Sequence, residues 1–74
     1  MTIGPVKHSL TLRGHRTSVT LEPEFWQAFR QIASEKNISI NALAARIDAK
    51  REVNTGLASA IRVYVLQYYS APGH

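Results

Sequence analysis

The chain has 74 residues, which is the size of one small domain and leaves no room for a second. Nine Lys and Arg against five Asp and Glu give a formal net charge of +4, and 45% hydrophobic residues indicate a chain that folds rather than a disordered basic tail. The absence of cysteine excludes disulfides, thiolate zinc sites and cysteine nucleophiles. A chain this short with no covalent staple usually gains stability from a second copy, so we expect a homodimer.

Gly4 and Pro5 make residues 1–7 the expected flexible arm, ahead of a folded domain over residues 8–70. Residues 71–74 contain Pro72 and Gly73, which stop a helix, and predict a short frayed tail.

Residues 7–21 alternate with period two and are rich in Thr, Val and Leu, which predicts extended chain with one buried face. The residues expected to be buried lie at even-numbered positions before Gly14 and at odd-numbered positions after it. They are His8, Leu10 and Leu12, followed by Thr17, Val19 and Leu21. Two interpretations remain open: residues 8–12 pair with 16–21 as a hairpin, or the chain forms one bent strand. We favour the bend, because Arg13-Gly14 is a poorer two-residue turn than Asn-Gly.

Glu22-Pro23-Glu24 predicts the start of a first helix, since proline suits the first helical position and carboxylates suit the positive end of the dipole. The helix ends near Lys36, with Asn37 as a left-handed cap. Its apolar stripe consists of Phe25, Trp26, Phe29, Ile32 and Ala33.

A second helix lies within residues 39–52, with Ser39 as its N-cap. After a break at residues 53–56, Asn54 or Thr55 caps a third helix from about Leu57 to Tyr69. The third helix is hydrophobic nearly all round and has to be buried, which a short chain cannot achieve alone. We therefore expect a dimer core of Val19, Leu21, Trp26, Phe29, Leu57, Ile61, Tyr64, Val65 and Tyr68.

Positive charge is concentrated at the start of the chain. Lys7, Arg13 and Arg16 lie within residues 1–21, which contain no acidic residue. A polyanion is the natural partner of such a segment, because nucleic-acid binding draws much of its affinity from phosphate neutralisation. Arg13 and His15, beside Gly14, are candidate phosphate contacts.

Arg16, Ser18 and Thr20 share one face of the expected strand while Val19 and Leu21 share the other. Arginine can donate two hydrogen bonds to guanine, and hydroxyl groups can bond either kind of base edge. A two-stranded ribbon fits the major groove, and the same strand from two subunits builds such a ribbon. These three residues are the candidate base contacts.

At this point the segment RTSVTLEPEFWQAFRQIASEKNISINALAARI, residues 16–47, resembles the ribbon-helix-helix family of DNA-binding proteins, of the Arc and MetJ type. The flanks RGHRTSV and SAIRVYVLQYY are similar to a small, mostly uncharacterised bacterial subfamily. The resemblance implies a mostly α fold with one short N-terminal strand, intertwined as a homodimer through an intermolecular antiparallel ribbon. The third helix is additional to the usual two.

The resemblance also implies a phosphate contact at the start of the second helix, which maps onto Ser39, Ile40 and Asn41. Residues 54–62 also look like the family's second helix, and in that case the contact moves to Asn54 and Thr55. The expected function is sequence-specific binding of double-stranded DNA, as a transcriptional repressor.

No paired carboxylates, nucleophile elbow or glycine-rich phosphate loop is present, so we expect no enzyme activity and no cofactor. His8, His15 and His74 have no second ligand at helical spacing, so no metal site is expected. No stretch of about 20 apolar residues and no signal-peptide core is present, which predicts a cytoplasmic protein, associated with the nucleoid when bound to DNA, without a membrane partner.

Two alternatives remain. A helix-turn-helix would read DNA with helix 39–52 through Asn41, Ala45 and Arg46. An antitoxin or protein-protein adaptor would hold a partner through exposed aromatic residues, although only about five residues follow Tyr69 as a toxin-binding tail.

Overall fold

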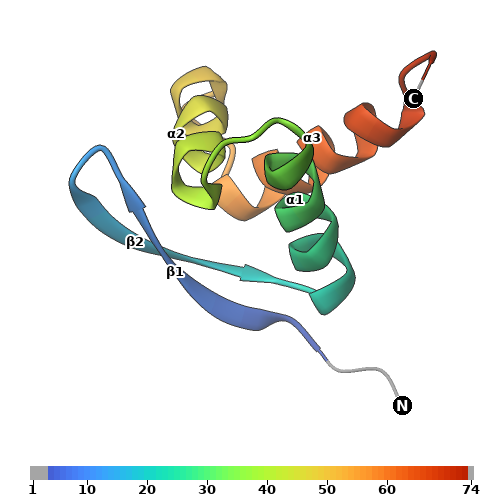
Figure 1. Ribbon diagram of the computed structural model, residues 1–74. Helices are drawn as coiled ribbons and strands as arrows, with labels where there is room; N and C mark the ends of the chain where they lie inside the picture. Colours follow the sequence, from blue (N-terminus) through green and yellow to red (C-terminus); the bar gives the residue numbers. More distant parts are fainter. Residues whose placement is uncertain (1–3, 74) are drawn as a thin grey trace.

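The computed structural model describes residues 4–73, a β-hairpin followed by three helices (Figure 1). The elements are β1 (Val6–Leu12), β2 (His15–Leu21), α1 (Pro23–Glu35), α2 (Ile40–Lys50) and α3 (Leu57–Ser70). Val6 and Lys7, which the sequence assigned to the arm, belong to β1. Gly4 and Pro5 of that arm lie in neither a strand nor a helix, while residues 1–3 and His74 of the tail lie outside the described residues.

The two strands pair antiparallel within one chain, with Leu12 opposite His15 and Val6 opposite Leu21. Arg13 and Gly14 form the turn with φ of 50° and 83°, and positive φ at both central residues is what a type I′ turn requires. The prediction of a bend with a single strand is therefore wrong. Arg13 adopts the left-handed conformation despite its side chain, because the turn allows both strands to bury leucine and valine on one face.

The helix boundaries follow the predictions closely. Asn37 has φ of 57° and donates its N–H to the Ser34 carbonyl, while Ile38 donates to Ala33, which is the Schellman pattern of helix termination. The Ser39 hydroxyl accepts the Ala42 amide at 3.0 Å, which confirms it as the N-cap of α2. The N-cap of α3 is Gly56, without a side-chain hydrogen bond, so the assignment of Asn54 or Thr55 to that position is wrong.

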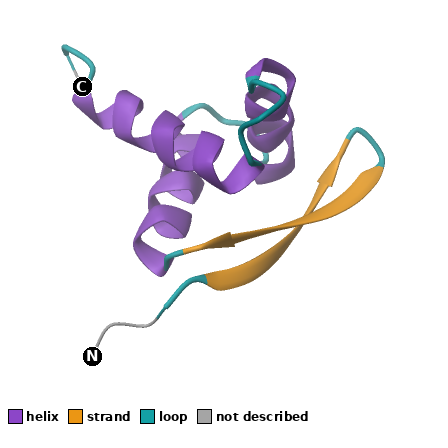
Figure 2. Ribbon diagram, turned by 180° about the vertical axis from the view of Figure 1, so that it is seen from behind, coloured by secondary structure: helices purple, strands orange, loops and turns teal. Residues whose placement is uncertain are grey.

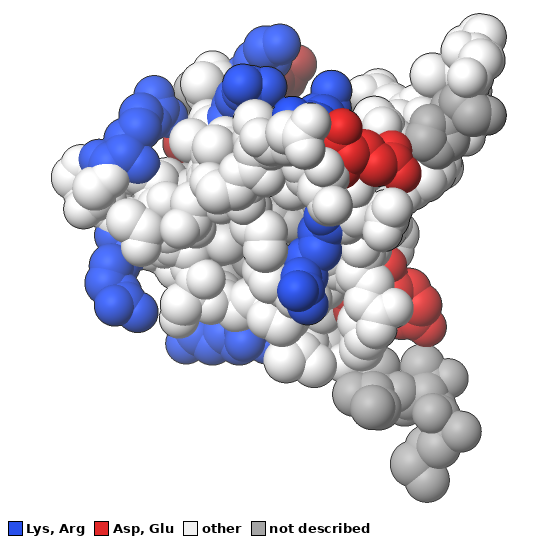
Figure 3. All heavy atoms as spheres, in the orientation of Figure 1, with Lys and Arg blue, Asp and Glu red and all other residues white. Residues whose placement is uncertain are grey.

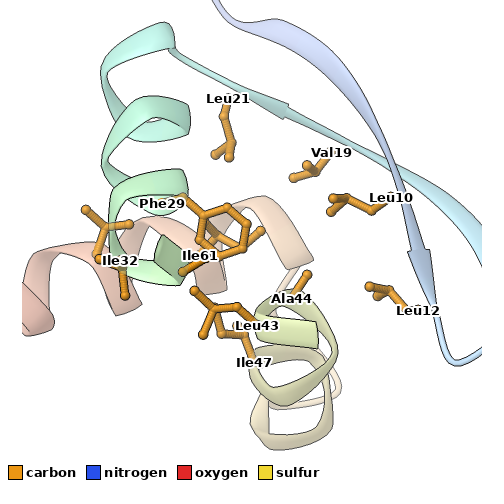
Figure 4. Packing of buried hydrophobic residues seen from close by; sticks show 12 residues of the cluster. Leu10, Leu12, Val19, Leu21, Phe29, Ile32, Leu43, Ala44, Ile47 and Ile61 are labelled. Carbon is orange, nitrogen blue, oxygen red and sulfur yellow. The ribbon is translucent and has the colours of Figure 1, made fainter. Parts of the chain in front are cut away.

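The helices lie together on one side of the hairpin (Figures 1 and 2). α2 packs beside β1, α3 contacts β2, and α3 also packs against both other helices. Every element contributes to a single core, seen in Figure 4. Its members are Leu10, Leu12, Val19, Leu21, Phe29, Ile32, Ala33, Leu43, Ala44, Ile47, Ile61 and Val65.

The core closes within one chain. Of the residues that the sequence assigned to a dimer core, Val19, Leu21, Phe29, Ile61 and Val65 are buried by the chain's own side chains. The inner stripe of α3, with Ile61 and Val65, is thus covered within one chain, and a part for the set in a dimer core stays a prediction. The half-buried residues of that set are Trp26, Leu57, Tyr64 and Tyr68.

α3 still leaves apolar surface uncovered, since Val63 is 51% and Leu66 is 64% exposed. Near the same end, the Tyr68 hydroxyl donates to Glu35 Oε1 at 2.6 Å and links α3 to α1. That bond to a carboxylate raises the pKa of Tyr68 to about 12.

Candidate nucleic-acid interface

The outer face of the hairpin is entirely polar. Side chains alternate along each strand, so residues opposite one another share a face. The outward pairs are Lys7 with Thr20, Ser9 with Ser18, and Thr11 with Arg16, and all six residues are exposed. Arg16, Ser18 and Thr20 thus point away from the helices, as the alternation predicts.

The sequence analysis missed the three outward residues of β1. Lys7, Ser9 and Thr11 alternate with His8, Leu10 and Leu12, and this period-two signal was present in the sequence. The unfavourable turn residues Arg13-Gly14 argue against pairing of the two strands and so hide this row at the level of sequence. With the hairpin formed, the polar face is two strands wide within a single chain.

No acidic residue lies on either strand. In Figure 3, Lys and Arg lie at the top, left and bottom of the face shown, with one group near its centre, while the larger acidic patches lie on the right. The carboxylates nearest the hairpin already have cationic partners. Arg62 Nε donates to Glu22 Oε1 at 2.9 Å, and Arg51 Nε donates to Asp48 Oδ1 at 2.7 Å.

These partners shift the titration of both carboxyls. The hydrogen bond from Arg62 holds the pKa of Glu22 below its ordinary value, and the hydrogen bond from Arg51 does the same for the pKa of Asp48. Both groups therefore stay ionised at neutral pH and remain matched to cations, so neither opposes an anion at the hairpin's outer face.

The turn carries the predicted phosphate contacts Arg13 and His15. Arg13 Nη2 lies 3.2 Å from Asp48 Oδ2, but its side chain is 61% exposed, and His15 is exposed. Both border a groove that lies between the turn, the end of α2 and the start of α3. Arg16, Thr17 and Arg51 also line this groove. Arg13 and Arg51 both form ion pairs with Asp48 there.

The start of α2 lies beside the outer edge of β1. Asn41 Oδ1 accepts the Thr11 amide at 3.0 Å, and the Ser39 hydroxyl is used in capping. Ile40 packs against the core. Of the three residues that the helix-turn-helix alternative uses, Ala45 packs partly against the core, whereas Asn41 and Arg46 are exposed.

The start of α3 is placed differently. Leu57 lies with Leu12 and Thr17 beside the groove at the turn, on the helix side of the hairpin. Thr55 is held by its backbone, since its amide donates to Glu52 and its carbonyl accepts from Arg51 Nη1. Asn54 is exposed.

The two outer edges of the sheet differ in how they are protected. The Thr11 amide donates to Asn41 and not to Arg16, so Thr11 and Arg16 are a pair without mutual backbone hydrogen bonds. Hydrogen-bonded and non-hydrogen-bonded pairs alternate along an antiparallel ladder, so Ser9 with Ser18 and Lys7 with Thr20 are pairs of the same kind. The backbone N–H and C=O groups of Arg16, Ser18 and Thr20 thus point outward from the free edge of β2, away from β1. Of these, only the Thr20 carbonyl has a partner among residues 4–73, Arg62 Nη2 at 3.4 Å.

His8 is engaged in packing. Its ring stacks on Trp26 with centroids 3.8 Å apart and planes 6° from parallel. This contact joins β1 to α1, and Phe29 behind it is fully buried. Within residues 4–73, no three His, Asp or Glu side chains gather as a metal site would require.

Residues 5–69, from before β1 to near the end of α3, match the ribbon-helix-helix domain. The chain belongs to the ribbon-helix-helix family. The match includes both β1 and α3, so neither element is an addition to the domain. No curated protein and no solved structure shows a significant match to the chain.

Ribbon-helix-helix proteins are in general DNA-binding regulators that dimerise, and they are typically not enzymes. The family therefore indicates in general terms a DNA-binding regulator. No helix within residues 4–73 has the length and apolar character needed to cross a bilayer.

Proposed function

We propose that this ribbon-helix-helix protein is a homodimeric transcriptional repressor that reads double-stranded DNA with β2 in the major groove. The observation that carries the proposal is the outward row of Arg16, Ser18 and Thr20 on a ribbon without acidic residues. Arg16 is the principal reader, because its guanidinium can donate two hydrogen bonds to guanine O6 and N7. The hydroxyls of Ser18 and Thr20 bond neighbouring base edges.

The dimer forms by pairing of the two β2 strands along their outer edges. The unpartnered backbone groups of Arg16 and Ser18 on that edge support this arrangement, because an open edge is a template for another strand. The product is a four-stranded sheet in which the two β2 strands are central. Each base-reading row then lies next to its symmetry mate.

The start of α2 supplies the main phosphate contact outside the sheet. Ser39 satisfies the amides of Ala42 and Leu43, while those of Ile40 and Asn41 have no partner among the described residues. Two free amides at the positive end of a helix suit a phosphate oxygen. The link from Asn41 to Thr11 joins the start of α2 to the edge of β1, whereas the start of α3 lies on the helix side of the hairpin, and this contrast supports Ile40 and Asn41 over Asn54 and Thr55. Arg13 and His15 add contacts at the turn.

Selection of random duplexes by the purified protein, followed by binding measurements on the selected site, tests the proposal. Arg16→Ala is expected to lose about 1–3 kcal/mol at one base pair and to relax selectivity there. Arg30→Ala is the matched control, because Arg30 is exposed on α1 and has the same charge. An Arg16→Ala protein that keeps full affinity and selectivity would show that β2 does not read bases.

Whether the protein represses or activates transcription is tested separately, with a reporter promoter whose polymerase-binding region contains the selected site. Repression predicts that transcription falls as the protein is added and recovers with Arg16→Ala. Transcription that rises instead would make the protein an activator.

A further inference from the structure

β1 carries three outward polar residues that neither the core nor the proposed base reading uses. Lys7, Ser9 and Thr11 are exposed, and they face the same way as Arg16, Ser18 and Thr20. None of their side chains has a hydrogen bond or ion pair within residues 4–73. The two rows form one continuous surface.

We propose that β1 is a phosphate-contacting strand, whose Lys7, Ser9 and Thr11 bind the DNA backbone on either side of the groove that β2 reads. This inference rests on the proposed function, since it requires that the hairpin face meets DNA. It assigns the two strands of one hairpin to different parts of the same ligand.

Strand spacing gives the first reason. Neighbouring strands lie about 4.8 Å apart, so the outer strands of the proposed four-stranded sheet are roughly 14 Å apart. The major groove of B-DNA is about 12 Å wide. The two central β2 strands fit between the groove walls, whereas the outer β1 strands lie above the walls, where the phosphates are.

The chemistry of the row gives the second reason. An ammonium group and two hydroxyls are common donors to phosphate oxygens, and such contacts carry no sequence information. The guanidinium, which suits bidentate base reading, occurs on β2 and not on β1. With no acid on either strand, phosphate approach meets no repulsion from the hairpin.

The third reason is that contacts with the helices hold β1 in place. The Thr11 amide donates a hydrogen bond to the Asn41 side chain. His8, which lies between Lys7 and Ser9 in the strand, stacks on Trp26. Both contacts hold the strand from its helix side, so its outward side chains keep their position relative to the start of α2. The row and the free amides of Ile40 and Asn41 can therefore meet the same backbone strand.

The test uses the full-length protein, its selected duplex and a scrambled duplex of the same length, measured over a series of salt concentrations. Lys7→Ala is expected to weaken binding to both duplexes by the same factor. The slope of log affinity against log salt should fall by about 0.9 for each Lys7 lost, close to 2 for the dimer. Lys50→Ala, an exposed lysine on α2, is the matched control and is expected to leave the slope unchanged.

The double variant Ser9→Ala with Thr11→Ala separates neutral contacts from charged ones. It is expected to weaken binding to both duplexes equally while the salt slope stays the same, because no counterion is released by a hydroxyl. Circular dichroism checks that these exposed changes leave the fold intact.

Two results would overturn the inference while leaving the proposed function standing. A loss of selectivity in the β1 variants would place β1 inside the groove, as one hairpin acting alone as the ribbon would do. Wild-type affinity and salt slope in Lys7→Ala, with selectivity still lost in Arg16→Ala, would remove β1 from the interface. Absence of duplex binding by the wild-type protein would instead refute the proposed function itself.

Discussion

The inner and outer faces of the β1–β2 hairpin are built from alternating residues of the same two strands, yet they serve different purposes. The inner face buries Leu10, Leu12, Val19 and Leu21 against the helices. The outer face exposes two lysine or arginine side chains and four hydroxyls, with no apolar and no acidic residue. Strand alternation alone thus separates the buried face from the face that we propose for DNA.

Because the core closes within one chain, the outer face contributes little to stability. None of its six residues belongs to the core, so a change on this face removes no buried side chain.

The largest effect is expected from the inner face. Leu21 is fully buried, and Leu21→Ala should lower the free energy of unfolding by about 2–5 kcal/mol, through lost transfer energy and the cavity left behind. The adjacent outward change Thr20→Ala should stay within about 0.5 kcal/mol. Urea denaturation followed by circular dichroism measures both. Equal destabilisation by the two variants would contradict the separation of the faces.

Arg16→Lys sharpens the role of the outer face, because it keeps the charge and removes the planar guanidinium. If Arg16 bonds guanine in bidentate fashion, the lysine variant should lose about 1–3 kcal/mol of discrimination at one base pair while non-specific affinity is kept. Competition binding with single-base variants of the selected site measures this. Full rescue of selectivity by lysine would reduce Arg16 to a phosphate contact.

Local signals in the sequence were sufficient for the helices. Pro23, Asn37 and Ser39 act within a few residues of their own position, and the structure confirms each of them at a helix end. The outward direction of Arg16, Ser18 and Thr20 also followed from alternation within one strand.

The hairpin was missed because its turn is locally unfavourable and its compensation is not local. Arg13 adopts φ of 50°, a conformation that residues other than glycine usually avoid. The turn is compensated because it pairs the two strands, whose leucines then pack against residues of α1, α2 and α3. Its ion pair with Asp48 joins positions 35 residues apart, and Arg62 meets Glu22 across 40. No pattern in a single sequence indicates such pairings, and for the same reason the contact from Asn41 to Thr11 was not predicted.

The turn itself gives a third prediction. Gly14 has φ of 83°, and an added Cβ meets no neighbouring atom, so only backbone strain opposes a larger residue there. Gly14→Ala should destabilise the protein by about 1–2 kcal/mol. Gly4→Ala, where φ is not positive and space is also free, is the matched control and should change stability by no more than about 0.5 kcal/mol. Thermal unfolding of the two variants is the measurement, and an undisturbed Gly14→Ala would argue against the type I′ turn.

The smallest effect concerns the ion pairs that hold the ends of the hairpin on its helix side. Glu22 and Asp48 both have a pKa below the ordinary value, because Arg62 and Arg51 donate hydrogen bonds to their charged forms. A carboxyl whose pKa is lower in the folded state adds stability that is complete above its unfolded pKa and is lost as the pH falls through the folded one. Stability should therefore decline on acidification below about pH 5 and be flat from there to neutrality as far as these groups are concerned.

Arg62→Met should reduce that acid-side decline, since the pKa of Glu22 then returns toward its ordinary value in the folded protein. Arg30→Met removes an arginine with no ion pair among residues 4–73 and should leave the pH profile unchanged. Unfolding midpoints in urea across the acidic range compare the two. The outer face has no carboxyl to titrate, so replacing Ser9, Ser18 or Thr20 by alanine should not alter the profile; a changed profile in those variants would mean that the two faces are coupled through protonation after all.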